Sequence, residues 1–189
     1  MTTWKNDVDQ LYSLLSQLSF RDLDSNELAQ EAGFALWQKL TTELREKSRT
    51  IYLVGNGASA SMASHYAADL AKNGHLHTQV FSDLSLITAI SNDMGYVHVF
   101  AEPLRRRGKS GDMLVAISSS GRSPNILAAV DLACDLGMTV VTLSAMAADN
   151  PLRARGRLNA YVAAQTYGLA ETCHAAILHR WKDLVEVAP

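Results

Sequence analysis

The sequence predicts an α/β fold, a three-layer sandwich in which helices flank a mostly parallel central sheet. Near-continuous apolar runs such as "TIYLVG", "DMLVAIS" and "MTVVTLS" are typical of parallel strands that are buried on both faces. Segments with helical periodicity alternate with these runs, as in "SPNILAAVDLACDLG". Alternation of strands and helices favours right-handed crossovers in one sheet.

Two amphipathic helices are expected before the first strand. Apolar residues from Val8 to Leu18 recur at helical spacing over residues 5–20, and Ser25 is a suitable N-cap for a second helix that continues to about residue 47. We therefore expect a single domain over residues 1–189 with an N-terminal helical extension over about 1–48. The apolar stripes of this extension must bury against the body of the domain or against another subunit.

The remaining elements follow from the same patterns. A helix is expected to leave the turn after residue 55, and residues 85–91 fit either a helix or a strand. Residues 146–159 resemble a loop, with a short helix over part of them as the alternative. Strands are predicted at 50–55, 77–82, 112–118 and 138–144, and further helices at 123–137 and 166–188.

Composition excludes several classes of function. The chain is 48% hydrophobic and 19% charged with a net charge of −2, which favours neither a nucleic-acid partner nor a membrane surface. The polar N-terminus lacks the order of a signal peptide, and no apolar run reaches the length of a membrane span, so we expect a cytoplasmic protein. Cys134 and Cys173 show no metal or redox spacing; buried free thiols are expected, with a disulfide between them as the alternative.

Two turns at strand ends have the composition of anion sites. Gly55 to Ser59 follows the first strand, and Ser118 to Ser123 follows "DMLVAI". Glycine lets a ligand approach the backbone, and free N–H groups at a helix start favour an anion. Ordinary caps and turns are the alternative interpretation. Neither turn is a P-loop or a complete dinucleotide fingerprint, so a compact phosphorylated metabolite is indicated and no nucleotide cofactor is.

The motifs in these segments resemble the sugar-isomerase (SIS) family, and within it the phosphoheptose isomerases. The resemblance runs from about residue 51 to 179 and is carried by "VGNGASASMASHYAADLAKNG", "SNDMGY", "AISSSGRS" and "ETCHAAILH". It implies the SIS fold, interconversion of sedoheptulose 7-phosphate and a heptose 7-phosphate for surface-polysaccharide precursors, and a homotetramer with sites at subunit interfaces.

The resemblance also implies roles for individual residues. It implies that phosphate is bound by Ser118, Ser119, Ser120 and Ser123. Sugar binding falls to Asn56, Gly57, Ser59, Asn92 and Asp93. The acid–base positions, which in some members of the family bind zinc, are His65, Asp69, Glu171 and His179.

The sequence departs from the family at four places. Ala58 replaces a second glycine, Asp69 replaces glutamate, Glu171 replaces glutamine, and "AMAADNP" replaces a Gly-Gly turn. The two acidic replacements indicate a distinct branch in which the metal site or the substrate differs.

Aldose–ketose isomerisation needs a base, an acid or cation for the enediolate oxygen, and a hold on the phosphate. In one interpretation Asp69 or Glu171 is the general base and His179 the general acid. In the other, the two histidines and two carboxylates bind a divalent ion such as Zn²⁺. Both histidines could instead be packing or surface residues.

Three functions compete at this point. The leading hypothesis is a heptose-phosphate isomerase. The alternatives are a non-catalytic sugar-phosphate-binding regulator or scaffold and an isomerase of another phosphosugar. The run Arg105 to Arg107 is expected to be a solvated face, or else a contact with substrate or a neighbouring subunit.

Overall fold

The computed structural model describes residues 3–187. The elements in chain order are α1 (Trp4–Ser16), β1 (Ser19–Asp22), β2 (Glu27–Leu28), α2 (Gln30–Glu46), β3 (Thr50–Gly55), α3 (Ala58–Gly74), β4 (His77–Val80), α4 (Leu84–Met94), the 3₁₀ helix η1 (Tyr96–His98), α5 (Ala101–Arg107), β5 (Met113–Ser118), α6 (Pro124–Asp135), β6 (Thr139–Ala145), β7 (Leu158–Val162) and α7 (Tyr167–Val187).

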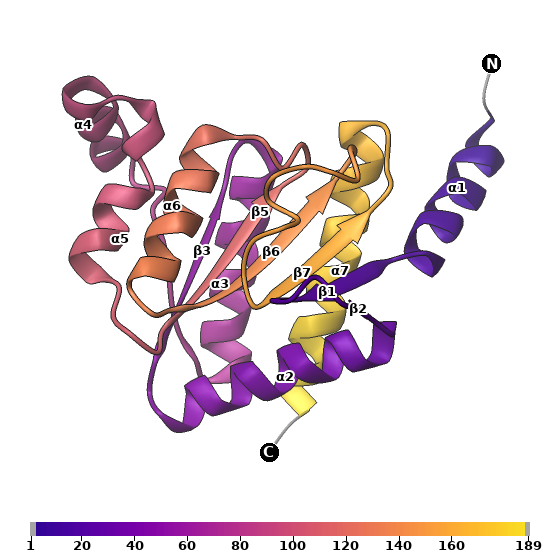
Figure 1. Cartoon of the computed structure of the whole chain (residues 1–189), viewed down its shortest axis with the longest axis horizontal. Helices are drawn as coiled ribbons and strands as arrows, with labels where there is room; N and C mark the ends of the chain where they lie inside the picture. The colour runs from indigo at the N-terminus through magenta and orange to yellow at the C-terminus, as the bar shows by residue number, and fades with distance from the viewer. Residues whose placement is uncertain (1–2, 188–189) are drawn as a thin grey trace.

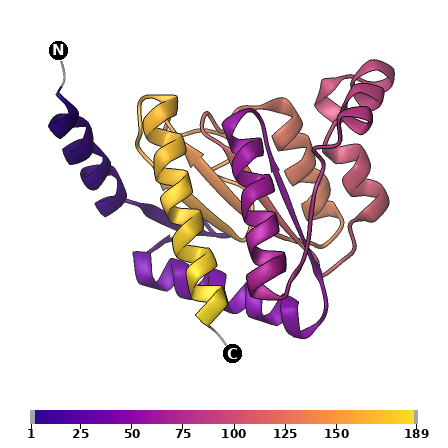
Figure 2. The same cartoon turned by 180° about the vertical axis from the view of Figure 1, so that it is seen from behind.

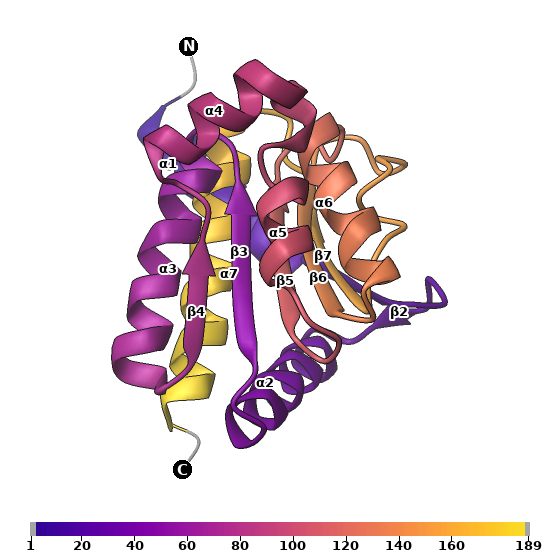
Figure 3. The same ribbon diagram turned by 90° about the vertical axis from the view of Figure 1, so that its left-hand side faces the viewer.

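The central sheet has seven strands in the order β2-β1-β7-β6-β5-β3-β4. The strands from β7 to β4 are parallel, whereas β1 and β2 are antiparallel additions at the β7 edge. Helices α3 and α7 lie side by side on one face, and α5 and α6 cover the other (Figures 1, 2 and 3). The predicted three-layer α/β fold is confirmed.

The predicted helices over residues 5–20 and from Ser25 onward are wrong where they meet, because residues 19–22 and 27–28 form strands. Helix α1 ends at Ser16, and β1 then pairs with β7. Ser25 does not cap a helix, because it lies in the turn between β1 and β2 with φ of 63°. Phe20 explains the difference: its side chain is fully buried and packs edge-on against Phe34 of α2. Pairing within the sheet overrides the local helical spacing.

The structure also decides between the alternatives for residues 85–91 and adds a strand to the end of the predicted loop over residues 146–159. Residues 85–91 are helical, within α4. The predicted loop over 146–159 is irregular to residue 157 but ends in β7, a strand that the sequence did not predict. All five residues of β7 are buried, between β6 and β1.

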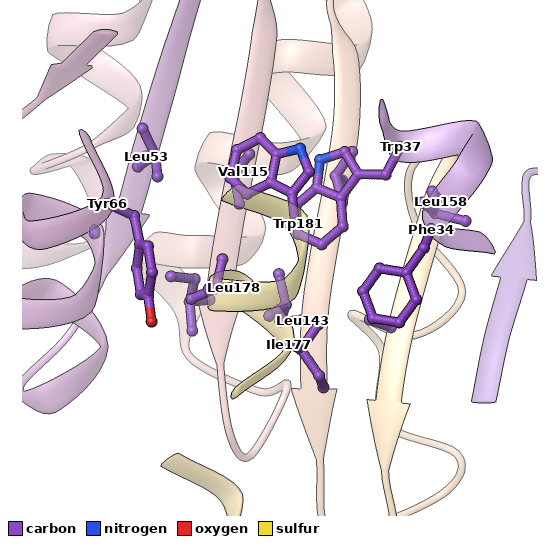
Figure 4. Close-up of a cluster of buried hydrophobic side chains, with 14 of the residues drawn as sticks. Phe34, Trp37, Leu53, Tyr66, Val115, Leu143, Leu158, Ile177, Leu178 and Trp181 are labelled. Carbon is purple, nitrogen blue, oxygen red and sulfur yellow. The ribbon is translucent and has the colours of Figure 1, made fainter. Parts of the chain in front are cut away.

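A large apolar cluster joins α2, α3 and α7 to the sheet. Trp37 of α2 and Trp181 of α7 stack with ring centroids 4.3 Å apart, and the Trp181 Nε1–H donates to Thr41 Oγ1 at 2.9 Å. Figure 4 shows this pair among the aliphatic side chains of β3, β5, β6 and β7. The stack therefore fixes α7, which carries candidate site residues, against the body of the domain.

Helix α1 extends away from the rest of the chain (Figures 1 and 2). It has no buried residue; Leu11, Leu14 and Leu15 pack only partly against the core, while Trp4 and Tyr12 are 78% and 74% exposed. Large apolar side chains on one projecting helix are typical of an interaction surface.

Three smaller observations complete the description. Among residues 3–187, no helix has the length and apolarity required to cross a membrane. Cys134 and Cys173 are both free, as expected, but only Cys173 is buried: the prediction of a buried thiol is wrong for Cys134, which is exposed on α6. Glu102 pairs with Arg106 at 2.6 Å and with Arg105 at 3.9 Å on the exposed surface of α5, consistent with the expected solvated face.

Candidate active site

The order of strands places the two predicted anion turns together. Strands β3 and β5 are neighbours, but the chain leaves them for α3 on one face of the sheet and α6 on the other. Turns that diverge in this way leave a crevice at the carboxyl ends of parallel strands, where ligands bind in open α/β sheets.

A cavity of about 160 Å³ occupies this crevice. Its lining combines both turns with the start of α7: Asn56, Ser59, Ile117, Ser118, Ser119, Ser120, Ser123, Tyr167 and Glu171. We call it the serine cavity. The described lining includes no lysine or arginine, and Glu171 is its one carboxylate.

The serine cavity is lined by neutral donors, a composition that suits an anion. The helices α3 and α6 both begin at this cavity, so the positive ends of their dipoles face it. The Ser118 and Ser123 hydroxyls are 3.2 Å apart and share one hydrogen bond. The buried Ser119 Oγ has no hydrogen-bond partner within the described chain. An unpaired buried hydroxyl is costly, so a ligand oxygen that accepts from it would stabilise the loop.

In the first turn, the backbone of Gly55 lies very close to that of Ser59. A Cβ on Gly55 would lie 2.6 Å from the Ser59 carbonyl carbon, so only glycine fits there. Ser59 is buried and lines the serine cavity, whereas Gly57 is exposed and lines an adjoining apolar cavity of about 90 Å³. Asn56 lines both cavities.

Asn56 is held by residues that the sequence analysis missed. Its side-chain amide pairs with that of Asn125, in the first turn of α6, through hydrogen bonds of 3.0 and 2.9 Å. The Tyr96 hydroxyl donates to Asn56 Oδ1 at 3.1 Å. The sequence did contain a signal for Asn125: it is an amide residue two positions after Ser123, in the helix that follows the second anion turn. Tyr167, which lines the serine cavity from α7, was also missed.

Three of the four predicted acid–base residues gather between α3 and α7. The His65 Nε2 lies 3.4 Å from Asp69 Oδ2, one helical turn away. The rings of His65 and His179 have centroids 5.9 Å apart and meet edge to face. Tyr66 lies beside them, with its ring centroid 5.0 Å from that of His179.

Tyr66 links α3 to α7 next to this cluster. Its hydroxyl donates to the Ala175 carbonyl of α7 at 2.7 Å. Burial, reinforced by the charge of Asp69, raises the pKa of Tyr66 to about 12. The phenol therefore remains protonated and keeps this link through the physiological pH range.

The fourth residue, Glu171, lies apart from this cluster at the serine cavity. It precedes His179 by eight residues, which is about 12 Å of helix rise. Within residues 3–187, no group of three or more histidine, cysteine, aspartate or glutamate side chains is arranged to hold a metal ion. The side-chain positions of one chain thus do not fit the predicted four-ligand zinc site.

The predicted pair Asn92 and Asp93 lies at the end of α4. The Asn92 Nδ2 donates to Asp93 Oδ1 at 2.9 Å, and both residues are exposed. Neither lines the serine cavity or its apolar neighbour. Their predicted contact with sugar hydroxyls therefore requires a ligand that extends beyond the serine cavity.

His174 is fully buried one turn after Glu171. Its Nε2–H donates to the Ser144 carbonyl at the end of β6, at 3.2 Å. Burial lowers the pKa of His174 to about 4, so the ring is neutral at physiological pH. This bond connects the first half of α7 to β6, the neighbour of the strand that leads into residues 118–123.

Comparison with known proteins agrees with this geometry. Residues 23–145 match the model of the SIS domain. A phosphoheptose isomerase of Bradyrhizobium sp. (strain BTAi1) is 36% identical over 162 residues, which cover 74% of this chain and 79% of that protein. A phosphoheptose isomerase of Bradyrhizobium sp. (strain ORS 278) is 33% identical over 90% of this chain and 98% of its own length.

A solved structure extends the likeness to three dimensions. The phosphoheptose isomerase of Neisseria gonorrhoeae superposes with a TM-score of 0.78 at 26% identity and covers 96% of this chain and 91% of its own. The matched SIS model includes both anion turns and ends with β6, so the candidate residues of α7 lie outside it. The family model and the curated relatives together show that this chain belongs to the SIS domain family, where its relatives include phosphoheptose isomerases.

Proposed function

We propose that this chain is a phosphosugar aldose–ketose isomerase that interconverts sedoheptulose 7-phosphate and a heptose 7-phosphate. The serine cavity is the observation that carries the proposal. It offers hydroxyl donors, two helix N-termini and one buried unpaired hydroxyl, which together suit a phosphate dianion. The names of the curated relatives supply the substrate class.

In this proposal the serine loop, Ser118–Ser123, holds the phosphate and leaves the sugar chain to extend from the cavity. A base removes the proton from the carbon next to the carbonyl while an acid protonates the carbonyl oxygen, which gives the enediol. The deprotonated acid then takes the proton of the other enediol hydroxyl, and the protonated base returns its proton to the former carbonyl carbon. Asp69 and His179 are assigned these roles, since they share one cluster in which His65 contacts both. Glu171 lies closer to the phosphate site and is assigned to the sugar hydroxyls.

We also propose a homotetramer in the cytoplasm, with neighbouring subunits bordering each site. The exposed apolar side chains of α1 support an assembly. The separation of the acid–base cluster from the serine loop along α3 and α7 supports a site that a second chain completes. Zinc bound by His65, Asp69, Glu171 and His179 remains a proposal that would require their side chains to converge on assembly or ligand binding. A role in surface-polysaccharide precursor synthesis belongs to the same proposal.

The proposal is tested by incubating the protein with sedoheptulose 7-phosphate and following the reaction by NMR. A new aldose anomeric signal is the expected result. Binding of the sugar phosphate without turnover would favour the alternative of a regulator or scaffold. Turnover of a different ketose phosphate, but not of the seven-carbon one, would favour an isomerase of another phosphosugar.

A further inference from the structure

The serine loop rests on residues 146–153, which we call the strap. The strap connects β6 to the turns before β7 and replaces a glycine turn with "MAADNPLR". The Ala145 N–H, just before it, donates to the Ser119 carbonyl at 2.9 Å, and the Leu152 N–H donates to the Gly121 carbonyl at 3.2 Å. The loop backbone is thus held at both ends of the strap.

Asn150 fills the space directly against the middle of the loop. Gly121 has φ of 62°, and a Cβ built on it would overlap Asn150 Oδ1. Asn150 is 1% exposed. The loop can therefore adopt this conformation only with glycine at position 121, and the asparagine side chain forms the floor on which Gly121 lies.

Hydrogen bonds fix the Asn150 side chain in place. Its Nδ2 donates to the Ala147 carbonyl at 2.8 Å and to the Ala145 carbonyl at 3.2 Å, and its Oδ1 accepts from the Arg153 N–H at 3.0 Å. Both the donor and the acceptor ends of the amide are used. Such a side chain has one orientation, unlike an apolar residue of similar size.

The strap is itself anchored to the far edge of the sheet. Arg153 is buried and stacks on the Tyr161 ring, with Cζ 3.9 Å from the centroid. Its guanidinium donates to the Ala148 carbonyl at 3.0 Å and to Ser19 Oγ at 3.1 Å. This path connects the serine loop, through Asn150, to the β1–β7 edge.

We propose that Asn150 is a positioning residue for phosphate binding, because its side chain sets the conformation in which the serine loop presents its hydroxyl and N–H donors. The inference rests on the proposed function only for the identity of the ligand. It concerns binding of the phosphate group and requires no turnover.

The test compares Asn150→Ala with Asn159→Ala. Asn159 is a matched control, since it is equally buried and its Nδ2 donates to Thr142 Oγ1 at 2.7 Å, but it does not support the serine loop. Inorganic phosphate binding is measured by calorimetry and unfolding by thermal melting. Asn150→Ala should weaken phosphate binding about tenfold, the scale of one or two lost hydrogen bonds. Asn159→Ala should lower the melting temperature but leave phosphate affinity unchanged.

A double-mutant cycle examines the contact itself. Gly121→Ala should abolish measurable phosphate binding. Gly121→Ala combined with Asn150→Ala should recover a small part of it, since removing the amide relieves the overlap with Oδ1 and Cγ and leaves only the residue 150 Cβ, at 2.9 Å. In turnover assays Asn150→Ala should raise KM with kcat within about threefold of the unmodified protein. Phosphate affinity equal to that of the unmodified protein, with only a lower melting temperature, would overturn the inference. Phosphate binding that depends on Asn150 in a protein that isomerises nothing would refute the proposed function and leave this inference standing.

Discussion

The side chains of Asn56 and Asn125 bond to each other in both directions, each amide donating to the other's oxygen. Asn56 belongs to the turn after β3, and Asn125 belongs to the helix after the serine loop. This amide pair is a direct side-chain link between the first anion turn and the helix that follows the second. It fixes the orientation of the Asn56 amide, whose Oδ1 also accepts from the Tyr96 hydroxyl.

Replacing Asn125 should therefore disturb substrate binding from a distance. In Asn125→Leu the Asn56 amide loses a donor and an acceptor, so we expect an increase in KM of about tenfold, the effect of one or two hydrogen bonds. Steady-state kinetics with sedoheptulose 7-phosphate measure it. Asn125→Asp keeps the acceptor, so its KM should lie between that of the Asn125→Leu variant and that of the unmodified protein. An unchanged KM in both variants contradicts a role for the pair.

The unpaired Ser119 hydroxyl gives a prediction with opposite signs for binding and stability. In Ser119→Ala the protein loses a buried hydroxyl that lacks a partner, so the free energy of unfolding should be unchanged or higher by about 1 kcal/mol. Phosphate affinity should fall, because the ligand loses a donor. Calorimetry and urea unfolding measure the two effects. Lower stability with normal phosphate affinity would show that the hydroxyl serves the fold.

The acid–base cluster predicts loss of turnover without loss of folding. Asp69→Asn and His179→Ala should each lower kcat by roughly 10²–10⁴-fold, the usual contribution of a positioned acid or base. Their melting temperatures should change little, since Asp69 is partly and His179 largely exposed. His75→Ala, at the exposed end of α3, is a control that should retain full activity.

The same variants distinguish proton transfer from metal binding. Elemental analysis of the unmodified protein and both variants, with chelator treatment, is the measurement. Bound metal that both substitutions remove, with activity lost to the chelator, supports the zinc proposal. Activity that resists the chelator but is lost in the variants supports direct proton transfer. Near-normal turnover in both variants would falsify this assignment and favour a binding scaffold.

Because His174 is buried, we predict that the free energy of unfolding decreases at acidic pH. Its pKa is lowered from 6.5 to about 4 in the folded protein, so between these values the unfolded chain binds a proton that the folded chain does not. The stability that His174 confers is complete above pH 6.5 and is lost as pH falls towards 4, by at most roughly 3 kcal/mol. Urea unfolding at about pH 7, 5.5 and 4.5 measures this slope. His174→Leu should flatten it over that window; an unchanged slope would assign the effect to other groups.

The projecting helix α1 predicts an oligomer. Burying Trp4 and Tyr12 against another chain would remove large apolar surfaces from water. Sedimentation at micromolar concentration should show a tetramer, and a variant with Trp4→Ser and Tyr12→Ser should shift towards smaller species. A monomer in the unmodified protein contradicts the proposal.

Local patterns predicted most of the central sheet. Strands β3, β5 and β6 are apolar through most of their length, so their pattern is unambiguous. The antiparallel strand β1 and the strand β7 were not predicted, because their pairing joins residues far apart in the chain, such as Phe20 and Ala160. Local periodicity cannot report such a partner.

The candidate site divides in the same way. Serine and glycine composition located both turns, since a helix that starts after a strand has a defined geometry. The supports of the turns, Asn125 and Asn150, are ordinary polar residues in sequence. Their roles follow only from what lies opposite them in space. The separation of Glu171 from the cluster around His179 was not predictable from spacing alone, because an eight-residue interval says nothing of side-chain direction.

The contact of Trp37 with Trp181 has a consequence for the order of folding. Thr41 and Trp181, which share a hydrogen bond in this cluster, lie 140 positions apart in the chain. Strand β1 likewise can pair only after β7, which is distant in sequence, has formed. Closing such long loops is entropically costly and slows folding. The crossovers from β3 to β6 need only nearer partners, so we expect them to form a nucleus on which both ends of the chain dock late. Amide exchange should accordingly be slowest in β3, β5 and β6, and α7 should bring its site residues into place in the final folding step.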